Sequence, residues 1–157
     1  MIVADACTII LLAKASVLEK AVKAYEMRLT GEVYREIAAG KEKMFPDALL
    51  VERLHNEKKV RIVETSEELT KKMMQDFNMG DGEASVIAAG LRQKDAIMAT
   101  DNRQARKCAK IYGLSLVGSV EIVVSLYHKK IIDKAKAKQA ITILLKEINV
   151  FRIIYRC

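Results

Sequence analysis

Two aspartates in the chain each follow a short apolar stretch and precede a helical pattern. Asp5 stands in "MIVADACTIILL" and Asp101 stands in "IMATDNRQAR". A carboxylate in an apolar stretch is costly to bury unless it is paired or bound to a metal ion. Aspartate is also a common N-cap, because its side chain accepts hydrogen bonds from the first N–H groups of a helix. Each residue therefore has two interpretations, a helix cap or a functional carboxylate.

Two glutamates border the apolar side of predicted helices. Glu36 lies in "GEVYREIAAG" and Glu83 lies in "GDGEASVIAAG", where Asp81 is predicted to cap the helix. Each glutamate alone is typical of a solvated helix surface. Four carboxylates that converge on one place repel one another and retain protons unless a cation is present. Hard divalent cations take oxygen ligands, and they can activate water and stabilise a phosphate during in-line displacement.

The elements that must position these acids alternate between strands and helices. Strands are predicted at "MIVAD", "MRLT", "VRIVET", "DAIMATD" and "SLVG", with helical patterns between them. Capping boxes are predicted at Ser16 with Glu19 and at Thr65 with Glu68. The alternation predicts an α/β fold with a central, mainly parallel sheet of about five strands flanked by helices. Functional groups in such sheets gather beyond the carboxyl ends of the strands, which places Asp5 and Asp101 at one edge.

The length and composition predict one domain over residues 1–157. The chain has 157 residues, of which 51% are hydrophobic, so it can bury a real core. The core is expected over residues 1–130, with a C-terminal helix and an edge strand at "VFRIIY" within 131–157. No apolar run approaches the roughly 18 residues that a membrane-spanning helix needs. Three cysteines without a CxxC spacing favour a reducing, cytoplasmic location.

The positive charge is concentrated in the second half of the chain. The net charge is +7, and residues 1–78 hold equal numbers of basic and acidic residues, so the excess lies in 79–157. Four basic residues fall at i, i+3, i+4 and i+7 directly after Asp101: Arg103, Arg106, Lys107 and Lys110. Such a stripe favours a polyanionic partner, RNA in particular, and the alternative is an ordinary solvated helix face.

The acidic blocks, taken in order, resemble the PIN-domain family of Mg²⁺- or Mn²⁺-dependent ribonucleases that includes VapC toxins. "IVADACTIILLAK" is similar to its opening block, "EVYREI" to the second and "GDGEASVIAAG" to the third. "ATDNRQARKCAKIYGLSLVGSVEIVVSLYHKKII" resembles the fourth block and the segment after it. The last stretch looks most like a VapC-related branch described only as predicted nucleic-acid-binding proteins. The resemblance implies a single PIN-like domain.

The resemblance also implies roles for individual residues. Asp5, Glu36, Glu83 and Asp101 become catalytic metal ligands for Mg²⁺ or Mn²⁺, with Asp81, Asn102 and Thr8 as supporting residues or additional ligands. The implied activity is RNA phosphodiester hydrolysis that leaves 5′-phosphate and 3′-hydroxyl ends. The implied role is the toxin of a toxin–antitoxin pair, with RNA and an antitoxin protein as partners and a homodimer as the assembly.

Two positions depart from the family pattern and keep an alternative open. Cys7 stands where the family often has Ser, Thr or Asn, and Asn102 stands where it often has an acid. A neutral amide binds a cation less strongly than a carboxylate does. The alternative is a catalytically weak PIN-like module that binds RNA, or a protein-interaction module whose carboxylates bind a partner's arginine.

Overall fold

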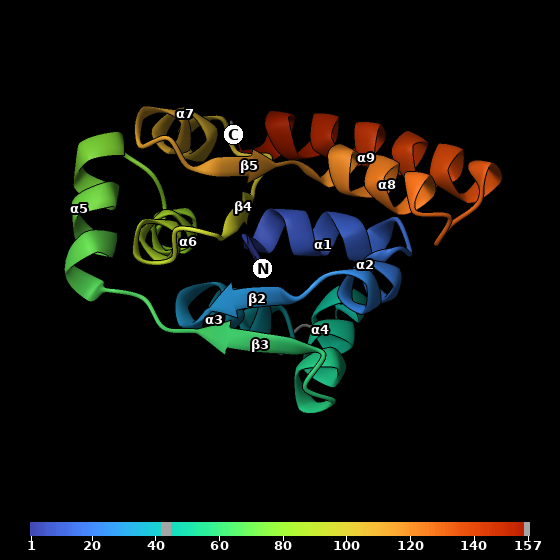
Figure 1. Ribbon diagram of the computed structural model, residues 1–157, viewed down its shortest axis with the longest axis horizontal. Helices are drawn as coiled ribbons and strands as arrows, with labels where there is room; N and C mark the ends of the chain where they lie inside the picture. Colours follow the sequence, from blue (N-terminus) through green and yellow to red (C-terminus); the bar gives the residue numbers. More distant parts are fainter. Residues whose placement is uncertain (42–44, 156–157) are drawn as a thin grey trace.

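The computed structural model describes residues 1–41 and 45–155 and shows an α/β fold built on one parallel sheet (Figure 1). Its five strands are β1 (Ile2–Ala4), β2 (Met27–Thr30), β3 (Val60–Val63), β4 (Ile97–Ala99) and β5 (Ser115–Val117). They lie in the order β3-β2-β1-β4-β5, and every neighbouring pair is parallel. The predicted fold class and all five predicted strands are confirmed.

Helices connect and cover the strands. In the described residues they are α1 (Ala6–Lys14), α2 (Leu18–Ala24), α3 (Gly31–Lys41), α4 (Pro46–Asn56), α5 (Glu67–Phe77), α6 (Asp81–Arg92), α7 (Arg103–Ile111), α8 (Ser119–His128) and α9 (Lys134–Tyr155). Helix α6 packs against β1, β2 and β4, with α5 on its outer side. Helices α8 and α9 lie side by side and pack against α1 (Figure 1). The loops that carry Asp5 and Asp101 follow the carboxyl ends of β1 and β4.

The strand order reverses direction between β1 and β4. The chain moves outward from β1 through β2 to β3, then returns to place β4 on the other side of β1 and β5 beyond it. Ala4 is in register with Ala99, so Asp5 and Thr100 leave neighbouring strands at the same level. Ligands of open parallel sheets bind in the crevice outside the strand ends at such a reversal. Asp5 lies directly at this position.

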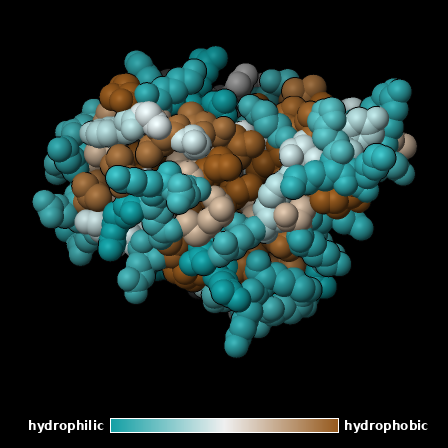
Figure 2. Space-filling model, viewed as in Figure 1, coloured by the Kyte–Doolittle hydropathy of each residue, from teal (hydrophilic) through white to brown (hydrophobic). Residues whose placement is uncertain are grey.

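The core is continuous from β1 to α9, and hydrophilic side chains surround an apolar area on one face (Figure 2). That area lies over the region where Figure 1 shows α1, β4 and the N-terminus. None of the described helices combines the length and apolar character needed to cross a membrane.

Helix α6 lies close to β4 at Gly90. A Cβ atom at Gly90 would lie 2.4 Å from Met98 Sδ and 3.2 Å from a methyl carbon of Leu114. Met98 is fully buried, so its side chain would have to shift within the core to accept a Cβ atom at Gly90. The glycine therefore permits the contact between α6 and the sheet that sets the position of the acidic first turn of α6.

Gly90→Ala is expected to lower the free energy of unfolding by up to about 2 kcal/mol. Overpacking of a filled core costs roughly 1–3 kcal/mol, and the better helix propensity of alanine offsets about 1 kcal/mol of it. Urea denaturation measures the change. Gly31→Ala is the matched control, because a Cβ atom at Gly31 meets only Arg35 Nη1 at 3.7 Å. Equal stabilities of the two variants would contradict the prediction.

The predicted edge strand at "VFRIIY" is wrong, because these residues form the last part of α9. The β-branched residues in this segment favour a strand by local propensity. They continue a helix that has already formed from Lys134, and extending a helix costs far less than starting one. The two sheet edges are β3 and β5.

Two predicted capping boxes are also wrong. Ser16 has a positive φ of 56° and lies outside α2, whose N-cap is Val17 without a side-chain hydrogen bond. The N-cap of α5 is Ser66 rather than Thr65, and its hydroxyl accepts from the Leu69 N–H at 3.3 Å. In the second case the pattern found the helix start but chose the neighbouring hydroxyl.

Candidate metal and nucleic-acid site

Asp5 caps a helix with one carboxylate oxygen, and its other oxygen has no hydrogen-bond partner among the described residues. It is the N-cap of α1, and its Oδ1 accepts from the Thr8 N–H at 2.7 Å. Its backbone N–H donates to the Ala99 carbonyl at 3.0 Å, which continues the pairing of β1 with β4. The side chain is only 2% exposed, and Oδ2 has no hydrogen-bond partner among the described residues. Capping therefore explains one oxygen of this buried carboxylate and leaves the other unexplained.

Burial raises the pKa of Asp5 from 3.8 to about 6. The charge of Asp101 raises it further, whereas the polar groups of Thr100 and Thr8 act in the opposite direction. Thr100 lies near, yet its hydroxyl makes no hydrogen bond of normal geometry to Oδ2. Desolvation thus outweighs the available hydrogen bonds, and a positive charge next to Oδ2 would remove the penalty.

Asp101 caps a helix other than the predicted one. It accepts from the Ser119 N–H at 3.1 Å through Oδ2 and at 3.3 Å through Oδ1, and Ser119 is the first residue of α8. The helix that follows Asp101, α7, has Asn102 as its N-cap. Burial is the main cause that raises the pKa of Asp101, and the hydrogen bonds to Ser119 oppose it. Asp101 is thereby held beside Asp5, but it has a structural partner of its own.

Asn102 connects the strand-end acids to the helix acids. Its Oδ1 accepts from the N–H groups of Gln104 at 2.8 Å and Ala105 at 3.0 Å. Its amide nitrogen donates to Glu83 Oε1 at 3.4 Å. The amide oxygen that would bind a cation is therefore occupied by the cap. The arrangement favours a supporting role for Asn102 over that of a ligand.

Glu36, Asp81 and Glu83 line one open cleft between α3 and the first turn of α6, with a volume of about 460 Å³. A Cβ atom at Gly82 would lie 2.6 Å from Glu36 Oε2, so this glycine lets the two helices bring their acids together. Partial burial raises the pKa of Glu36, and the charges of Glu83 and Asp81 raise it further. Asp81 is not the cap of α6, because Gly80 occupies that position and Asp81 is the exposed first residue.

The four predicted ligands thus form two neighbouring pairs. Asp5 and Asp101 lie at the ends of β1 and β4, while Glu36 and Glu83 lie across the cleft, and Asn102 connects the pairs. Within the described part of the chain, no three Asp, Glu, His or Cys side chains are placed to hold one metal ion. The donor set nevertheless fits a hard divalent cation, because it is made of carboxylate oxygens and includes the unpartnered Oδ2 of Asp5.

Sequence reasoning placed Thr8 near the site but missed three hydroxyls around it. The Thr8 hydroxyl donates to the Ala99 carbonyl at 3.3 Å and the residue is fully buried, so Thr8 supports the backbone around Asp5. Thr100 accepts from the Asn102 N–H at 3.1 Å. Thr30 and Ser85 form a buried pair behind Glu36 and Glu83. The polar residue within the apolar run "EASVIAAG" was the available signal for Ser85.

Three of the four basic residues of α7 are exposed beside this site: Arg103, Lys107 and Lys110. Arg106 is different, because its guanidinium donates to the Thr100 carbonyl at 3.0 Å and pairs with Glu121 at 3.6 Å. Arg106 holds the loop after β4 against α8. The predicted stripe therefore has three exposed basic side chains and a fourth, Arg106, that has structural partners.

Comparison with known families agrees with this arrangement. A family model described as a PIN domain matches residues 1–153. The chain belongs to the PIN-domain family. PIN domains are generally nucleases, they bind nucleic acids, and they typically use divalent metal ions. No curated protein and no solved structure shows significant similarity to this PIN domain.

Proposed function

We propose that this PIN-domain protein is a Mg²⁺- or Mn²⁺-dependent endoribonuclease. The observation that carries the proposal is Asp5, whose buried Oδ2 has no partner at the point where the strand order reverses. A charge kept in such a place costs free energy, and a cation would offset that cost. The PIN family, a family of nucleases, supplies the class of reaction.

The carboxylates have distinct proposed roles. Asp5 is the central ligand, Glu36 and Glu83 are ligands from the cleft, and Asp101 is a ligand that must share its carboxylate with the N–H of Ser119. Asp81 lines the same cleft and holds negative charge near the cation. When bound, the cation would supply Lewis acidity for phosphodiester hydrolysis. Asn102 orients Glu83, and Thr8 orients Asp5 through its backbone N–H.

The toxin role, an antitoxin partner, a homodimer and a cytoplasmic location belong to the same proposal. They rest on the likeness of the sequence blocks to VapC proteins. An antitoxin arginine would find carboxylates in the cleft between α3 and α6. The apolar area in Figure 2 is a surface on which a second copy can pack.

A catalytically weak RNA-binding module is the second candidate, and Asn102 favours it. Its oxygen is used by the cap of α7, and no acid stands in its place. In that case the protein binds RNA with a strong salt dependence and without turnover. A protein-interaction module would bind an arginine-containing peptide in place of the cation.

Incubation of the protein with a mixed pool of structured and single-stranded RNAs tests the proposal. We expect cleavage in Mg²⁺ or Mn²⁺ that stops in EDTA, with 5′-phosphate on the products. RNA binding without cleavage in either metal would favour the weak module. If the protein neither binds RNA nor is stabilised by the cation, the result would favour the protein-interaction module.

Neutralising the three exposed residues of α7 is expected to weaken RNA binding. The triple variant loses three positive side-chain charges from α7 and keeps Arg106, which has structural partners. Its substitutions are Arg103→Gln, Lys107→Gln and Lys110→Gln. Each phosphate contact to a single strand contributes about 0.7 to the slope of log affinity against log salt, so the slope should fall by about 2. Fluorescence anisotropy with a labelled RNA at several salt concentrations measures it.

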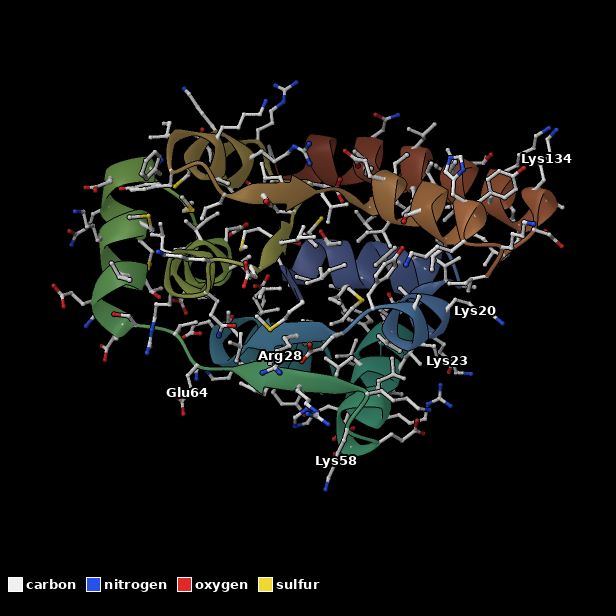
Figure 3. All side chains as sticks on the ribbon, in the orientation of Figure 1. Lys20, Lys23, Arg28, Lys58, Glu64 and Lys134 are labelled. Carbon is white, nitrogen blue, oxygen red and sulfur yellow. The ribbon has the colours of Figure 1, made fainter. Side chains whose placement is uncertain are left out.

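The matched control neutralises Lys20, Lys23 and Lys58, which project from α2 and from the turn before β3 (Figure 3). This control removes the same charge from a region distant from α7, and its salt slope should stay close to that of the unmodified protein. Equal losses in both triple variants would show that only the net charge matters and would contradict a binding stripe on α7.

A further inference from the structure

Two hydroxyl side chains form a buried pair behind the acidic cleft. Thr30 is the last residue of β2 and Ser85 lies in α6, and neither side chain has any exposed surface. The distance from Thr30 Oγ1 to Ser85 Oγ is 2.6 Å. Because a buried hydroxyl without a partner is costly, such a pair persists only when every group in it is satisfied.

The neighbouring groups fix the direction of this hydrogen bond. The Ser85 hydroxyl donates its one proton to the Gly82 carbonyl at 2.7 Å. Thr30 must therefore be the donor to Ser85, and Thr30 Oγ1 in turn accepts from the Val33 N–H at 3.2 Å. The bonds run in one direction from the backbone of α3 through two hydroxyls to the backbone of α6. Each hydroxyl donates once and accepts once.

Both ends of this network lie next to the acids of the cleft. Val33 is one turn before Glu36 on α3, and Gly82 directly precedes Glu83 on α6. At Gly82 the two helices are so close that a Cβ atom would meet Glu36 Oε2 at 2.6 Å. The charges of Glu83 and Asp81 on α6 repel that of Glu36, so other contacts must hold the first turns of α3 and α6 together.

We propose that Thr30 and Ser85 are positioning residues for the cation site, because their hydrogen bond holds Glu36 and Glu83 at the separation at which one divalent cation binds both. The inference rests on the proposed function. Neither hydroxyl touches the cation or RNA, since both are fully buried behind the cleft. They act through the backbones of α3 and α6, as supporting groups around metal ligands commonly do.

Mn²⁺ affinity, measured from the electron paramagnetic resonance signal of free Mn²⁺, tests the inference without any activity assay. Ser85→Ala and Thr30→Val should each weaken Mn²⁺ binding about tenfold, the lower range for loss of a supporting partner. Thr30→Ser keeps the hydroxyl and should restore nearly the affinity of the unmodified protein. The double variant should be no weaker than either single variant, because both changes break the same hydrogen bond.

A stability control separates positioning from general destabilisation. Val123→Ala removes buried methyl groups from α8, which packs on α1, α2 and α9 and not on the network, and should lower the melting temperature while leaving Mn²⁺ affinity unchanged. Ser85→Ala keeps the Thr30 hydroxyl that accepts from the Val33 N–H, so it is the variant expected to fold if Thr30→Val, which removes that acceptor, does not.

Two results would overturn the inference, and they differ in what else they overturn. If the unmodified protein binds Mn²⁺ and the Ser85→Ala and Thr30→Val variants bind it equally well, the positioning role is refuted while the proposed function stands. If the unmodified protein binds no Mn²⁺, the cation site itself is refuted, and the positioning role is refuted with it.

Discussion

Asp5→Asn is expected to lower the rate of RNA cleavage about a thousandfold or more, while the protein stays folded. A loss of this size corresponds to about 4 kcal/mol of transition-state stabilisation. Asparagine keeps an oxygen that accepts from the Thr8 N–H, so the cap of α1 is retained. It replaces the unpartnered Oδ2 with a neutral group that donates and does not bind a cation. The substitution therefore removes the proposed cation ligand, Oδ2, and keeps the oxygen that caps α1.

The measurement compares initial cleavage rates in Mn²⁺ with circular dichroism spectra of the same preparations. Asp95→Asn is the matched control, because Asp95 is an exposed aspartate in the turn before β4. The Asp95→Asn protein should cleave RNA at the rate of the unmodified protein. A fully active Asp5→Asn protein would refute the proposed role of Asp5 and with it the cation site.

The strands that carry Asp5 and Asp101 were predictable because short, apolar, parallel strands have a strong local signal. The sequence also predicted that both acids lie at one edge, since the carboxyl ends of parallel strands meet there. It predicted that a cap at Asp5 would belong to the following helix, as the structure shows, but it did not show which helix Asp101 caps. Asp101 accepts from Ser119, which is 18 residues further along the chain, and no local pattern predicts such a partner.

The errors near the site have a common physical cause. Residue type and spacing predict caps at Asp81 and Thr65, but the neighbouring residues, Gly80 and Ser66, have the extended backbone of an N-cap. The third predicted cap, Ser16, has a positive φ and lies outside α2. Cap chemistry depends on φ and ψ at one residue, which tertiary packing decides. The buried pair of Thr30 and Ser85 was missed for a related reason. Its two members are 55 positions apart and meet only when α6 packs on β2.

The pH dependence of stability offers a second large expected effect. In the cation-free protein, the free energy of unfolding should fall by roughly 2 kcal/mol as the pH rises from about 4 to about 6. Burial raises the pKa of Asp5 from 3.8 to about 6, so within this window the folded protein holds a proton that the unfolded chain has lost. The stabilisation is complete below the unfolded pKa and is lost as the pH passes the folded pKa.

Other carboxylates change the size of this slope but not its sign. Burial also raises the pKa values of Asp101 and Glu36, which adds to the fall in the same direction. The glutamates whose pKa values are lowered by hydrogen bonds to basic side chains are fully exposed, and exposed ion pairs contribute little to stability. They are Glu26, Glu57 and Glu67.

Urea denaturation at pH values from 4 to 8, with and without Mn²⁺, measures the effect. Asp5→Asn should flatten most of the slope between pH 4 and 6, because the group that titrates is gone. Mn²⁺ should oppose the loss in the unmodified protein, since a cation binds the ionised carboxylate and competes with the proton. Equal slopes in the unmodified protein and in Asp5→Asn would show that Asp5 does not titrate in this range. The same buried carboxylate that makes the cation-free protein less stable at neutral pH is thus the group that would give the proposed site its affinity for a cation.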